Sequence, residues 1–469
     1  MGNPHILAIP YPAQGHVIPL MELSHRLVDH GFSITFVYTD FNHKRVKDAF
    51  GNKVEAEGSI HLVSIPDGME PGEDRNHLGK LTDGITNVMP SEFRKLLKKI
   101  NGFEDDKISC VIADVNMGWA LDIAAEFQIP GAAFWPASAF LLALLLSTNN
   151  LIDDQVIDKD GENQSSYKFG TPINGEKMIE LCPNTPAMHP KNFLWVSLGD
   201  FTTQKITFEF SKRNIKTIQN VEWLICNTSF DLEPGALSFF PQILPIGPLS
   251  ATNQLEPLAG SFWPEDETCL QWLDQQQPGS VIYVAFGSFT VFDPIQFQEL
   301  ALGLELSNRP FLWVVRADIT QGTGCEQLYP FGFKTRVGSR GKMVGWAPQR
   351  ALLAHPSIAC FISHCGWNST VEGLSNGVPF LCWPYFADQF IDETYISEIW
   401  KIGLSLRRDE RKIINREEIK SKVGQLLKDD SFKERALKLK GLVMNSVKEN
   451  GSSNKIFNDF IKWMKSEKS

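Results

Sequence analysis

The sequence has little that would hold a metal ion, a disulfide framework or a nucleic acid. Its eight cysteines are scattered over 469 residues without a CxxC pair, which favours reduced, mostly buried thiols in the cytosol. His364 and Cys365 beside Cys360 could form half of a zinc site, but no second ligand pair follows at a suitable spacing, so we expect no metal. The formal net charge of -10 argues against sequence-independent nucleic-acid binding, which needs clustered lysine and arginine.

Signals for secretion or membrane insertion are also missing. The first residues carry no basic region, and their apolar run is too short for a signal peptide. The strongest apolar stretch, residues 132–147, is broken by Pro136 and is shorter than the roughly 20 residues that span a bilayer. It is more typical of a buried strand followed by a buried helix. We therefore expect a cytoplasmic protein without a membrane span.

Three common ligand or catalytic motifs are absent or out of context. No GxGxxG follows a predicted strand and no GxxxxGK[ST] occurs, so NAD and Walker-type nucleotide sites are poorly supported. The "GLSNG" at 373–377 fits GxSxG, but a nucleophile elbow needs a strand before it and a helix after it, and here the order is reversed. Asp158 and Asp160 could chelate a divalent ion, but no strand precedes them, and we expect a solvated loop.

The sequence does contain two series of short apolar segments that alternate with helical patterns. Continuous apolar strands with helices between them predict parallel sheets that are covered on both faces, which is the α/β class. The first series of predicted strands is 5–10, 33–39, 60–66, 108–114, 129–135 and 221–227. The second series is 280–288, 311–316, 342–346, 358–363 and 378–384. Predicted helices include 17–30 and 294–306.

The two series predict two domains. The length is about three times that of a common single domain, and a proline-rich segment at 247–262 separates the two series as a linker. We therefore predict an N-terminal domain at 1–246, a C-terminal domain at 263–450, and a last helix at 451–469. Residues 454–465 place apolar side chains on one helix face, which predicts that this helix docks on the N-terminal domain. Those side chains are Ile456, Phe457, Phe460, Ile461 and Met464.

Two ionisable residues of the first series follow predicted strands. In a doubly wound sheet, ligands bind beyond the carboxyl ends of the strands. His16 ends the loop after the first strand, and Asp114 ends "ISCVIAD". A histidine is poised near neutral pH and gains basicity from a carboxylate on its other nitrogen, so the two could be a base and its orienting group. From these residues alone, the alternative of an ordinary histidine near a helix start and a loop-capping aspartate remains open.

The segment "IACFISHCGWNST" (358–370) predicts an anion site in the second series. A buried strand is followed by Gly366, which permits a tight turn, and then by residues suited to start a helix. The N-terminus of a helix presents unpaired N–H groups and the positive end of its dipole, so a phosphate fits there. His364 could add a donor, and Glu372 could accept hydrogen bonds from sugar hydroxyls. Ser288, in "AFGSF" (285–289), follows another strand and could add further donors.

The wider segment from Trp346 to Gln389, with WAPQ, HP, HCGWNS, E, GVP, WP and DQ in order, closely resembles the signature box of plant family 1 UDP-dependent glycosyltransferases. The resemblance extends to "PYPAQGHVIPLMELSHRL" near the start, to "VAFGS" and to the C-terminal helices, and leaves out only residues 150–200. It implies the GT-B architecture, in which two Rossmann-like domains face each other. The C-terminal domain of that architecture holds the UDP-sugar and the N-terminal domain holds the acceptor.

The resemblance also implies a role for individual residues. The catalytic pair would be His16 and Asp114. Trp346 would stack on uracil, and the base and ribose would further contact Ala347, Gln349 and Glu372. The diphosphate would lie against Ser288, His364, Gly366, Asn368 and Ser369. The transferred sugar would contact Trp367, as a wall, together with Asp388 and Gln389. Less specific expectations for acceptor contacts fall on Gly15, Trp135 and Tyr385, the last at a position that the family often fills with an aliphatic residue.

The implied reaction is an inverting transfer of a sugar, glucose being favoured by the final Gln of the box, to a hydroxyl of a small hydrophobic plant metabolite such as a flavonoid, phenolic or terpenoid. UDP-glucose would be the co-substrate, with no metal and no other cofactor, and we expect a monomer. Two alternatives remain open: a UDP-sugar epimerase or hydrolase on the same scaffold, and a non-catalytic UDP-sugar-binding protein.

Overall fold

The computed structural model describes residues 3–50, 59–102, 107–157, 178–198, 200–219, 221–251, 260–319 and 328–466. The chain forms two compact units. The first contains the chain up to residue 251, residues 260–263 and the C-terminal segment from Asn445, and the second contains Pro264–Met444. Each unit has its own sheet and its own apolar core. Residues 252–259, in the segment predicted as a linker, lie outside the described residues.

The first unit contains a seven-stranded sheet in the order β3-β2-β1-β4-β5-β6-β7, and every neighbouring pair is parallel. Its strands are β1 (His5–Ile9), β2 (Ser33–Thr39), β3 (Ile60–Ile65), β4 (Ile108–Asp114), β5 (Gly131–Trp135), β6 (Trp223–Cys226) and β7 (Ile243–Pro245). Strand β7 was not predicted, because its proline argues against a central strand. The structure places it at the edge of the sheet, where proline is tolerated.

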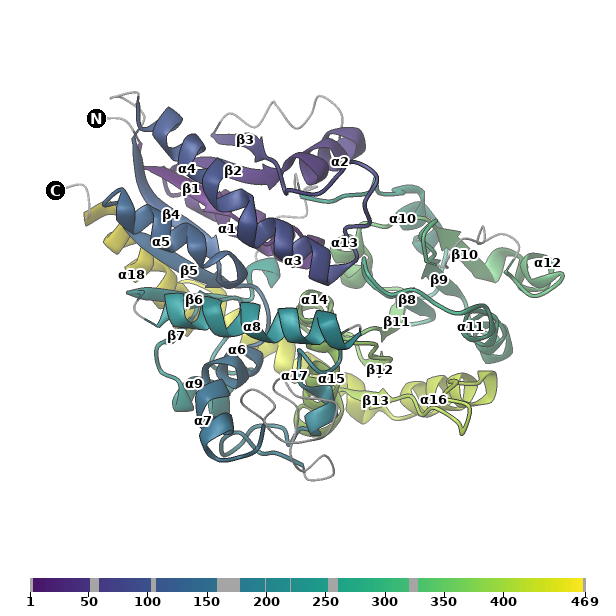
Figure 1. The fold of residues 1–469 in the computed structure, drawn as a ribbon. Coiled ribbons are helices and arrows are strands. Elements are labelled where there is room, and N and C mark those ends of the chain that lie inside the picture. Colours follow the sequence, from purple (N-terminus) through teal and green to yellow (C-terminus); the bar gives the residue numbers. More distant parts are fainter. Residues whose placement is uncertain are drawn as a thin grey trace. The chain divides into compact units, whose positions relative to one another are not determined.

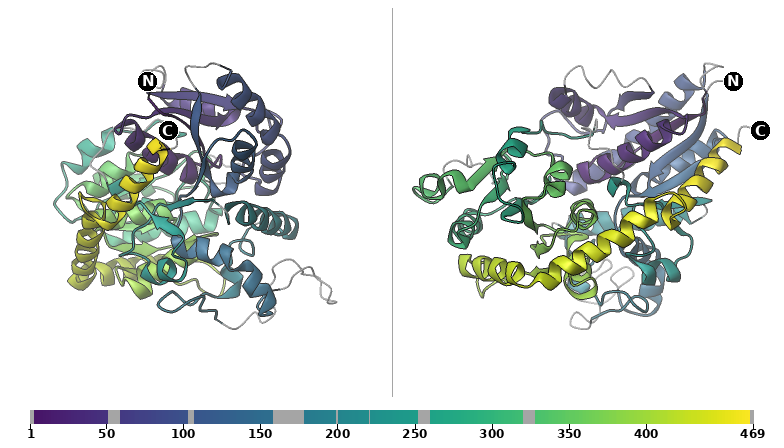
Figure 2. Two further views of the ribbon diagram at one scale, coloured as in Figure 1. Left: turned by 90° about the vertical axis from the view of Figure 1, so that its left-hand side faces the viewer. Right: turned by 180° about the vertical axis from the view of Figure 1, so that it is seen from behind.

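Helices cover both faces of this sheet. The helices of this unit are α1 (Gln14–Val28), α2 (Asp40–Phe50), α3 (Leu78–Asn87), α4 (Met89–Ile100), α5 (Trp119–Glu126), α6 (Ala139–Leu146), α7 (Thr148–Asp153), α8 (Phe201–Ile218), α9 (Pro234–Phe239) and α18 (Ser452–Ser466). Helices α3, α4, α5 and α8 lie on one face, and α1 and α18 lie on the other (Figures 1 and 2). The buried strand and helix predicted for 132–147 are β5 and α6.

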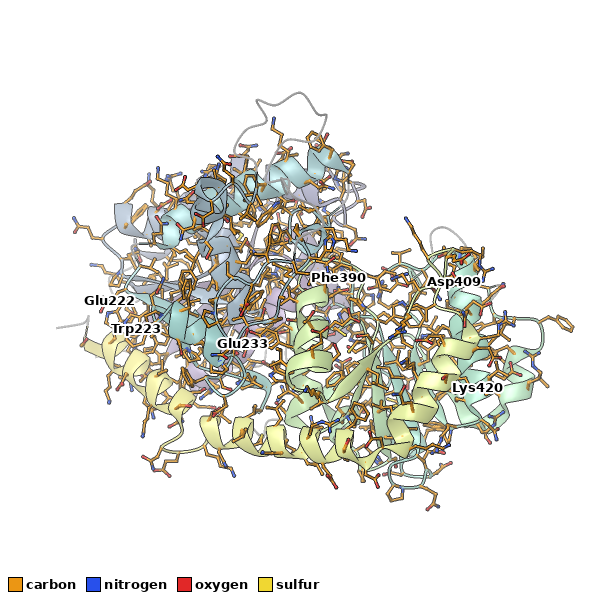
Figure 3. All side chains as sticks on the ribbon, turned by 90° about the horizontal axis from the view of Figure 1, so that it is seen from below. Glu222, Trp223, Glu233, Phe390, Asp409 and Lys420 are labelled. Atoms are coloured by element: carbon orange, nitrogen blue, oxygen red, sulfur yellow. The ribbon has the colours of Figure 1, made fainter. Side chains whose placement is uncertain are left out.

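The last helix, α18, packs on the first unit, as its apolar face predicted (Figure 2). Phe457, Phe460, Ile461 and Met464 are buried there. The Trp223 ring lies 5.2 Å from the ring of Phe460 and 5.8 Å from that of Trp463. Trp463 Nε1 donates to Glu222 Oε2 at 3.0 Å. Figure 3 labels Glu222 and Trp223 beside this helix. The C-terminus therefore contributes to the core of the N-terminal unit.

The second unit contains a six-stranded sheet in the order β10-β9-β8-β11-β12-β13, again parallel throughout. Its strands are β8 (Val281–Ala285), β9 (Phe311–Val314), β10 (Gly341–Val344), β11 (Ile358–Ser363), β12 (Phe380–Cys382) and β13 (Gly403–Ser405). Its helices are α10 (Thr268–Leu273), α11 (Pro294–Ser307), α12 (Phe333–Val337), α13 (Gln349–Ala354), α14 (Trp367–Ser375), α15 (Gln389–Thr394), α16 (Arg416–Lys428) and α17 (Asp430–Val447). The predicted α/β class with two parallel sheets is confirmed.

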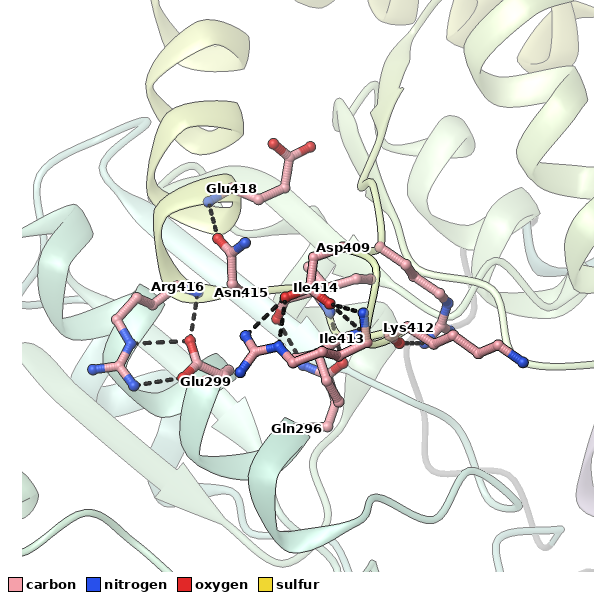
Figure 4. A network of polar contacts seen from close by, with 11 residues as sticks. Gln296, Glu299, Asp409, Lys412, Ile413, Ile414, Asn415, Arg416 and Glu418 are labelled. Atoms are coloured by element: carbon pink, nitrogen blue, oxygen red, sulfur yellow. Dashed lines mark hydrogen bonds and ion pairs between the residues drawn. The ribbon is translucent and has the colours of Figure 1, made fainter.

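Polar contacts tie helix α16 to helix α11 (Figure 4). The buried amide of Gln296 donates to the Ile414 carbonyl at 2.8 Å and accepts from the Ile414 N–H at 2.9 Å. Glu299 accepts from the backbone N–H of Arg416 at 2.7 Å and from its Nε at 2.9 Å. Because buried backbone groups need partners, Gln296 anchors the start of α16. These contacts also fix helix α11, which is the helix that follows β8 in the chain.

Among the described residues, no helix is both long enough and apolar enough to cross a membrane. The described cysteines, seven in number, are all buried and free of disulfide bonds, whereas Cys325 lies outside the described residues.

Candidate functional site

The structure brings His16 and Asp114 into direct contact. Strands β1 and β4 are parallel neighbours, with Ile9 opposite Ala113, so both end at the same edge of the first sheet. Asp114 is the last residue of β4, and His16 lies in the first turn of α1. His16 Nδ1 lies 2.7 Å from Asp114 Oδ2. Helix α1 begins at Gln14, three residues before the predicted start, so His16 belongs to the helix and not to the loop before it.

The surroundings of the pair favour one tautomer of His16. The Asp114 side chain is 0% exposed, and its other oxygen accepts from the Asn116 N–H at 2.8 Å. Because a carboxylate can only accept a hydrogen bond, His16 carries its proton on Nδ1, which faces Asp114. This leaves His16 Nε2 as a hydrogen-bond acceptor. The His16 side chain is 22% exposed, so it remains accessible. This is the arrangement of a general base with its orienting carboxylate.

Tyr11 is an ionisable side chain that lies close to the pair. Its ring centroid lies 5.1 Å from that of His16. Burial, followed by the charge of Asp114, raises the pKa of the Tyr11 phenol far above its usual value. Tyr11 therefore stays protonated at neutral pH, and His16 is the group of this cluster that can accept a proton.

Two predicted acceptor residues of the first unit differ in exposure. Gly15 is exposed in the first turn of α1, next to His16. Trp135, at the end of β5, is 2% exposed, and its Nε1 donates to the Ser138 carbonyl at 2.9 Å. The Trp135 indole is thus an interior group that supports the start of α6, and it does not present a face to a ligand in this conformation.

In the second unit, His364 lies between two glycines. Gly287 follows β8 with φ +65°, and a Cβ atom there would lie 2.5 Å from His364 Nε2. A Cβ atom at Gly366 would lie 2.8 Å from the same nitrogen. Both distances are shorter than real Cβ contacts, so only glycine fits at either position without a shift. The two turns predicted to bind phosphate, after β8 and after β11, therefore meet at the His364 imidazole.

The positive charge beside His364 belongs to Arg316, which also forms an ion pair with Asp318 at 2.9 Å. Burial, followed by the charge of Arg316, lowers the pKa of His364 to about 4, so the imidazole is neutral at pH 7. The buried Arg316 guanidinium, which follows β9, donates to the carbonyls of Gly287 and Thr290. The sequence analysis included Arg316 only as the end of the predicted strand 311–316. Its hydrogen bonds to the two carbonyls and its effect on the pKa of His364 were not predicted.

Helix α14 begins beside His364 without a side-chain cap from its own N-cap residue. Gly366 is the N-cap residue, and it has no side chain to cap the first N–H groups. The Trp367 N–H donates to Asp388 Oδ2 at 3.2 Å. Asn368 and Ser369 occupy the rest of the first turn. Helix N-termini of this kind attract anions, which agrees with the predicted diphosphate site.

The Trp367 indole, which was predicted as a wall for the sugar, is almost completely buried. The side chain is 2% exposed, and its ring lies 6.3 Å from that of Trp400. At the helix start, the backbone N–H of Trp367 is engaged by the Asp388 carboxylate.

A hydrogen-bonded network links the two helix starts of the second sheet. Gln349 Nε2 donates to Glu372 Oε2 at 2.7 Å and to Ser369 Oγ at 2.9 Å. Gln349 Oε1 accepts from the Tyr283 hydroxyl at 3.0 Å. Burial raises the pKa of Glu372, while the Gln349 bond opposes that shift. Tyr283 was not among the predicted residues, since a tyrosine in an apolar strand is indistinguishable from a core residue in the sequence.

The residues predicted around the base lie beside this network. Trp346 is partly buried, and its carbonyl accepts from the Asp266 N–H at 3.0 Å. Ala347 is buried next to it. Glu265 was also not predicted. Burial, followed by the charges of Glu372 and Glu267, raises its pKa to about 7.

The last predicted residues lie in the loop before α15 and at the first position of that helix. Gln389 Oε1 accepts from the N–H groups of Tyr385 and Phe386 at 2.7 and 3.2 Å. With its oxygen engaged, the Gln389 amide offers only N–H donors to a ligand. The ring of Tyr385 packs edge-on against Phe286 and Phe292, so much of its surface belongs to the core of the second unit rather than to an acceptor surface.

Among the described residues, no group of three or more His, Cys, Asp or Glu side chains could hold a metal ion. Asp158 and Asp160 lie outside the described residues.

Comparison with known proteins gives a consistent result. A family model described as "UDP-glucoronosyl and UDP-glucosyl transferase" matches residues 6–446. UDP-glycosyltransferase 83A1 of Arabidopsis thaliana is 44% identical over 477 residues, covering 100% of this chain and 98% of the relative. A 7-deoxyloganetin glucosyltransferase of Catharanthus roseus is 32% identical over 487 residues, covering 100% and 98%. The structure of Phytolacca americana UGT2, complexed with UDP-2fluoro-glucose and pterostilbene, has a TM-score of 0.79 at 26% identity, covering 98% of this chain and 100% of that chain.

Proposed function

The chain belongs to the UDP-glucoronosyl and UDP-glucosyl transferase family and is a plant-type UDP-dependent glycosyltransferase of the GT-B fold, and from this premise we propose that it transfers glucose from UDP-glucose to a hydroxyl group of a small plant metabolite. The observation that carries the proposal is the 2.7 Å contact between His16 and the buried Asp114. It supplies a base of the kind that an acceptor hydroxyl needs.

The second unit holds the donor in this proposal. Trp346 and Ala347 bind the uracil, and Gln349 and Glu372 bind the ribose. The diphosphate lies at the start of α14, where it meets the first N–H groups of the helix and the side chains of His364, Ser369 and Ser288. Gly366 lets the diphosphate approach the backbone, and Asn368 adds a further donor. Asp388 and the N–H donors of Gln389 bind the glucose hydroxyls.

The first unit supplies the base. His16 Nε2 takes the proton from the acceptor hydroxyl as its oxygen attacks the anomeric carbon. The bond between that carbon and the UDP oxygen breaks in the same step, so an α-linked donor gives a β-glucoside. Asp114 stabilises the imidazolium that forms, because its buried carboxylate accepts a hydrogen bond from the Nδ1–H group. The product proton is then released from His16 to solvent.

The departing UDP is stabilised without a metal ion in this proposal. The helix N-terminus supplies N–H donors and a positive dipole end at the position where negative charge develops. His364 adds an N–H group, and the buried charge of Arg316 lies behind the turn that carries Ser288. The added charge of the leaving diphosphate thus meets groups that are already oriented.

We propose a hydrophobic acceptor with a free hydroxyl, such as a phenolic, flavonoid or terpenoid, for a cytoplasmic, monomeric enzyme. Two comparisons support this range of acceptors. A relative is named for 7-deoxyloganetin, and the similar Phytolacca americana structure holds pterostilbene.

The test is a panel of such acceptors incubated with UDP-glucose and analysed by mass spectrometry for products heavier by one hexose, with NMR of the anomeric proton to identify the β-glucoside. UDP release is measured with and without each acceptor. Release that needs the acceptor supports the proposal. Release of equal rate without an acceptor would indicate a hydrolase, and binding of UDP-glucose without any turnover would indicate a binding protein.

A further inference from the structure

Tyr283 is a buried polar residue in the middle of the second sheet. It lies on β8, is 1% exposed, and its ring stacks on that of Phe361 at 4.9 Å. Its hydroxyl donates to Gln349 Oε1 at 3.0 Å. Burying a phenol hydroxyl inside an apolar strand costs free energy unless the hydroxyl is hydrogen-bonded. The bond to Gln349 therefore explains why a tyrosine can occupy this buried position.

The bond from Tyr283 fixes the orientation of the Gln349 amide. Gln349 must direct its oxygen to the Tyr283 hydroxyl and its nitrogen to Glu372 and Ser369. A carboxylate only accepts hydrogen bonds, so a rotated amide would place an oxygen against the Glu372 oxygen. Because Gln349 Nε2 holds Glu372 Oε2 at 2.7 Å, it also fixes the direction of the second carboxylate oxygen.

We propose that Tyr283 is a positioning residue that sets the selectivity of the donor site for the ribose of UDP, acting through Gln349 on Glu372. The inference rests on the proposed function, which places the ribose hydroxyls at Glu372. A hydroxyl group is distinguished from a hydrogen atom only if its acceptor is held at the correct distance and angle. Tyr283 supplies that restraint although it lies one residue behind the groups that touch the donor.

The chemical state of Tyr283 suits this role. Burial, followed by the charge of Glu372, raises the pKa of its phenol far above the usual value. The hydroxyl therefore remains a donor over the whole pH range in which an enzyme of this kind is assayed.

The experiment measures the affinity of the protein for UDP, 2′-deoxy-UDP and 3′-deoxy-UDP by titration calorimetry. Tyr283→Phe removes one hydroxyl and keeps the ring that packs on Phe361. We expect the preference for UDP over the deoxy compounds to fall by about three- to tenfold in this variant, the value of one buried hydrogen bond. The KM for UDP-glucose should rise, while kcat at saturating donor changes less.

Two further variants separate positioning from a general loss of packing. Tyr395→Phe removes the hydroxyl of another buried tyrosine of the same unit, whose ring packs on Trp400, and it should leave the preference unchanged. In a Gln349→Ala background, Tyr283→Phe should change the preference by less than about twofold, because the residue through which it acts is missing.

Each outcome of these affinity measurements either supports or contradicts the positioning role of Tyr283. If Tyr283→Phe weakens UDP and both deoxy compounds equally, or keeps its full effect in the Gln349→Ala background, the positioning role is wrong while the proposed function stands. If the unmodified protein binds none of the three compounds, the donor site itself is wrong and the inference falls with it.

Discussion

His16 Nδ1 and Asp114 Oδ2 lie 2.7 Å apart, although the two residues are separated by 98 positions in the sequence. Parallel pairing of β1 with β4 brings them together, since both strands end at the same edge of the sheet. The contact joins a partly exposed imidazole to a fully buried carboxylate. The pair is therefore held from the inside of the protein, and only His16 is presented to a ligand.

Asp114→Asn should lower kcat by at least about a hundredfold. An asparagine has one acceptor oxygen, whereas Asp114 accepts from both His16 and the Asn116 N–H. If the amide nitrogen faces His16, the imidazole keeps its proton on Nε2 and cannot act as a base. Steady-state kinetics with an acceptor from the panel measures the change. The control is Asp122→Asn on the exposed face of α5, which should retain full activity; an equally active Asp114→Asn variant would exclude the orienting role.

Gly287→Ala should raise the KM for UDP-glucose about tenfold or more, because its Cβ would displace the imidazole of His364. Gly279→Ala is a closely matched control. Gly279 also has a positive φ, +62° against +65°, but a Cβ there meets no atom within 4 Å. Both variants carry the same backbone strain, about 1 kcal/mol, so a difference in KM between them reports the contact with His364. Equal KM values for the two would show that the position of His364 does not matter for donor binding.

The lowered pKa of His364 predicts a loss of stability in mild acid. The folded pKa of about 4 lies below the ordinary value of 6.5, so between these two values the unfolded chain binds a proton that the folded chain does not. The stabilising contribution is complete above pH 6.5 and is lost as the pH falls toward 4, by on the order of 1–3 kcal/mol. Urea unfolding at pH 7 and pH 4.5 should show this loss in the unmodified protein. It should be smaller in His364→Gln and unchanged in the exposed-site control His61→Gln; an identical loss in all three proteins would assign it to other groups.

Phe460→Ala should reduce the free energy of unfolding of the first unit by about 3–5 kcal/mol. Phe460 is completely buried and contacts Trp223, so its removal leaves a cavity between α18 and the sheet. Thermal unfolding followed by calorimetry measures the effect. Lys462→Ala changes an exposed residue of the same helix and should alter the melting temperature little. A Phe460→Ala protein as stable as the original would mean that α18 does not contribute to the core.

The sequence was sufficient to predict most strands and the edge at which the site lies, because buried parallel strands form continuous apolar segments with distinct ends. The start of α1 was not predictable in the same way. Its N-cap residue, Ala13, makes no side-chain cap, and Pro19 lies inside the helix, so the usual start signal is missing. Strand β13, only Gly403–Ser405, is too short to form a pattern.

The contacts within the donor site lay beyond what spacing reveals. The position of His364 depends on the close approach of Gly287, which is far away in the sequence. It also depends on the positive φ of Gly287, which only the folded chain shows. Tyr283 and Arg316 were not predicted for a related reason. Tyr283 lies in an apolar strand and resembles a core residue, and Arg316 follows an apolar strand and resembles a loop residue; only their hydrogen-bond partners reveal their roles. The same limit explains why Trp135 and Trp367 were expected at a ligand and were found buried.

The central claim is that His16 is the base for glucosyl transfer, and the most direct measurement is acceptor-dependent UDP release from UDP-glucose by the unmodified protein and by His16→Gln, with UDP affinity titrated in parallel. We predict that UDP is released only in the presence of an acceptor, at a rate about 10²–10⁴ times lower in the variant. The UDP affinities of the two proteins should agree within about twofold, because the proposed uridine site belongs to the other unit. Undiminished release by His16→Gln, or release at the same rate without an acceptor, would contradict the account.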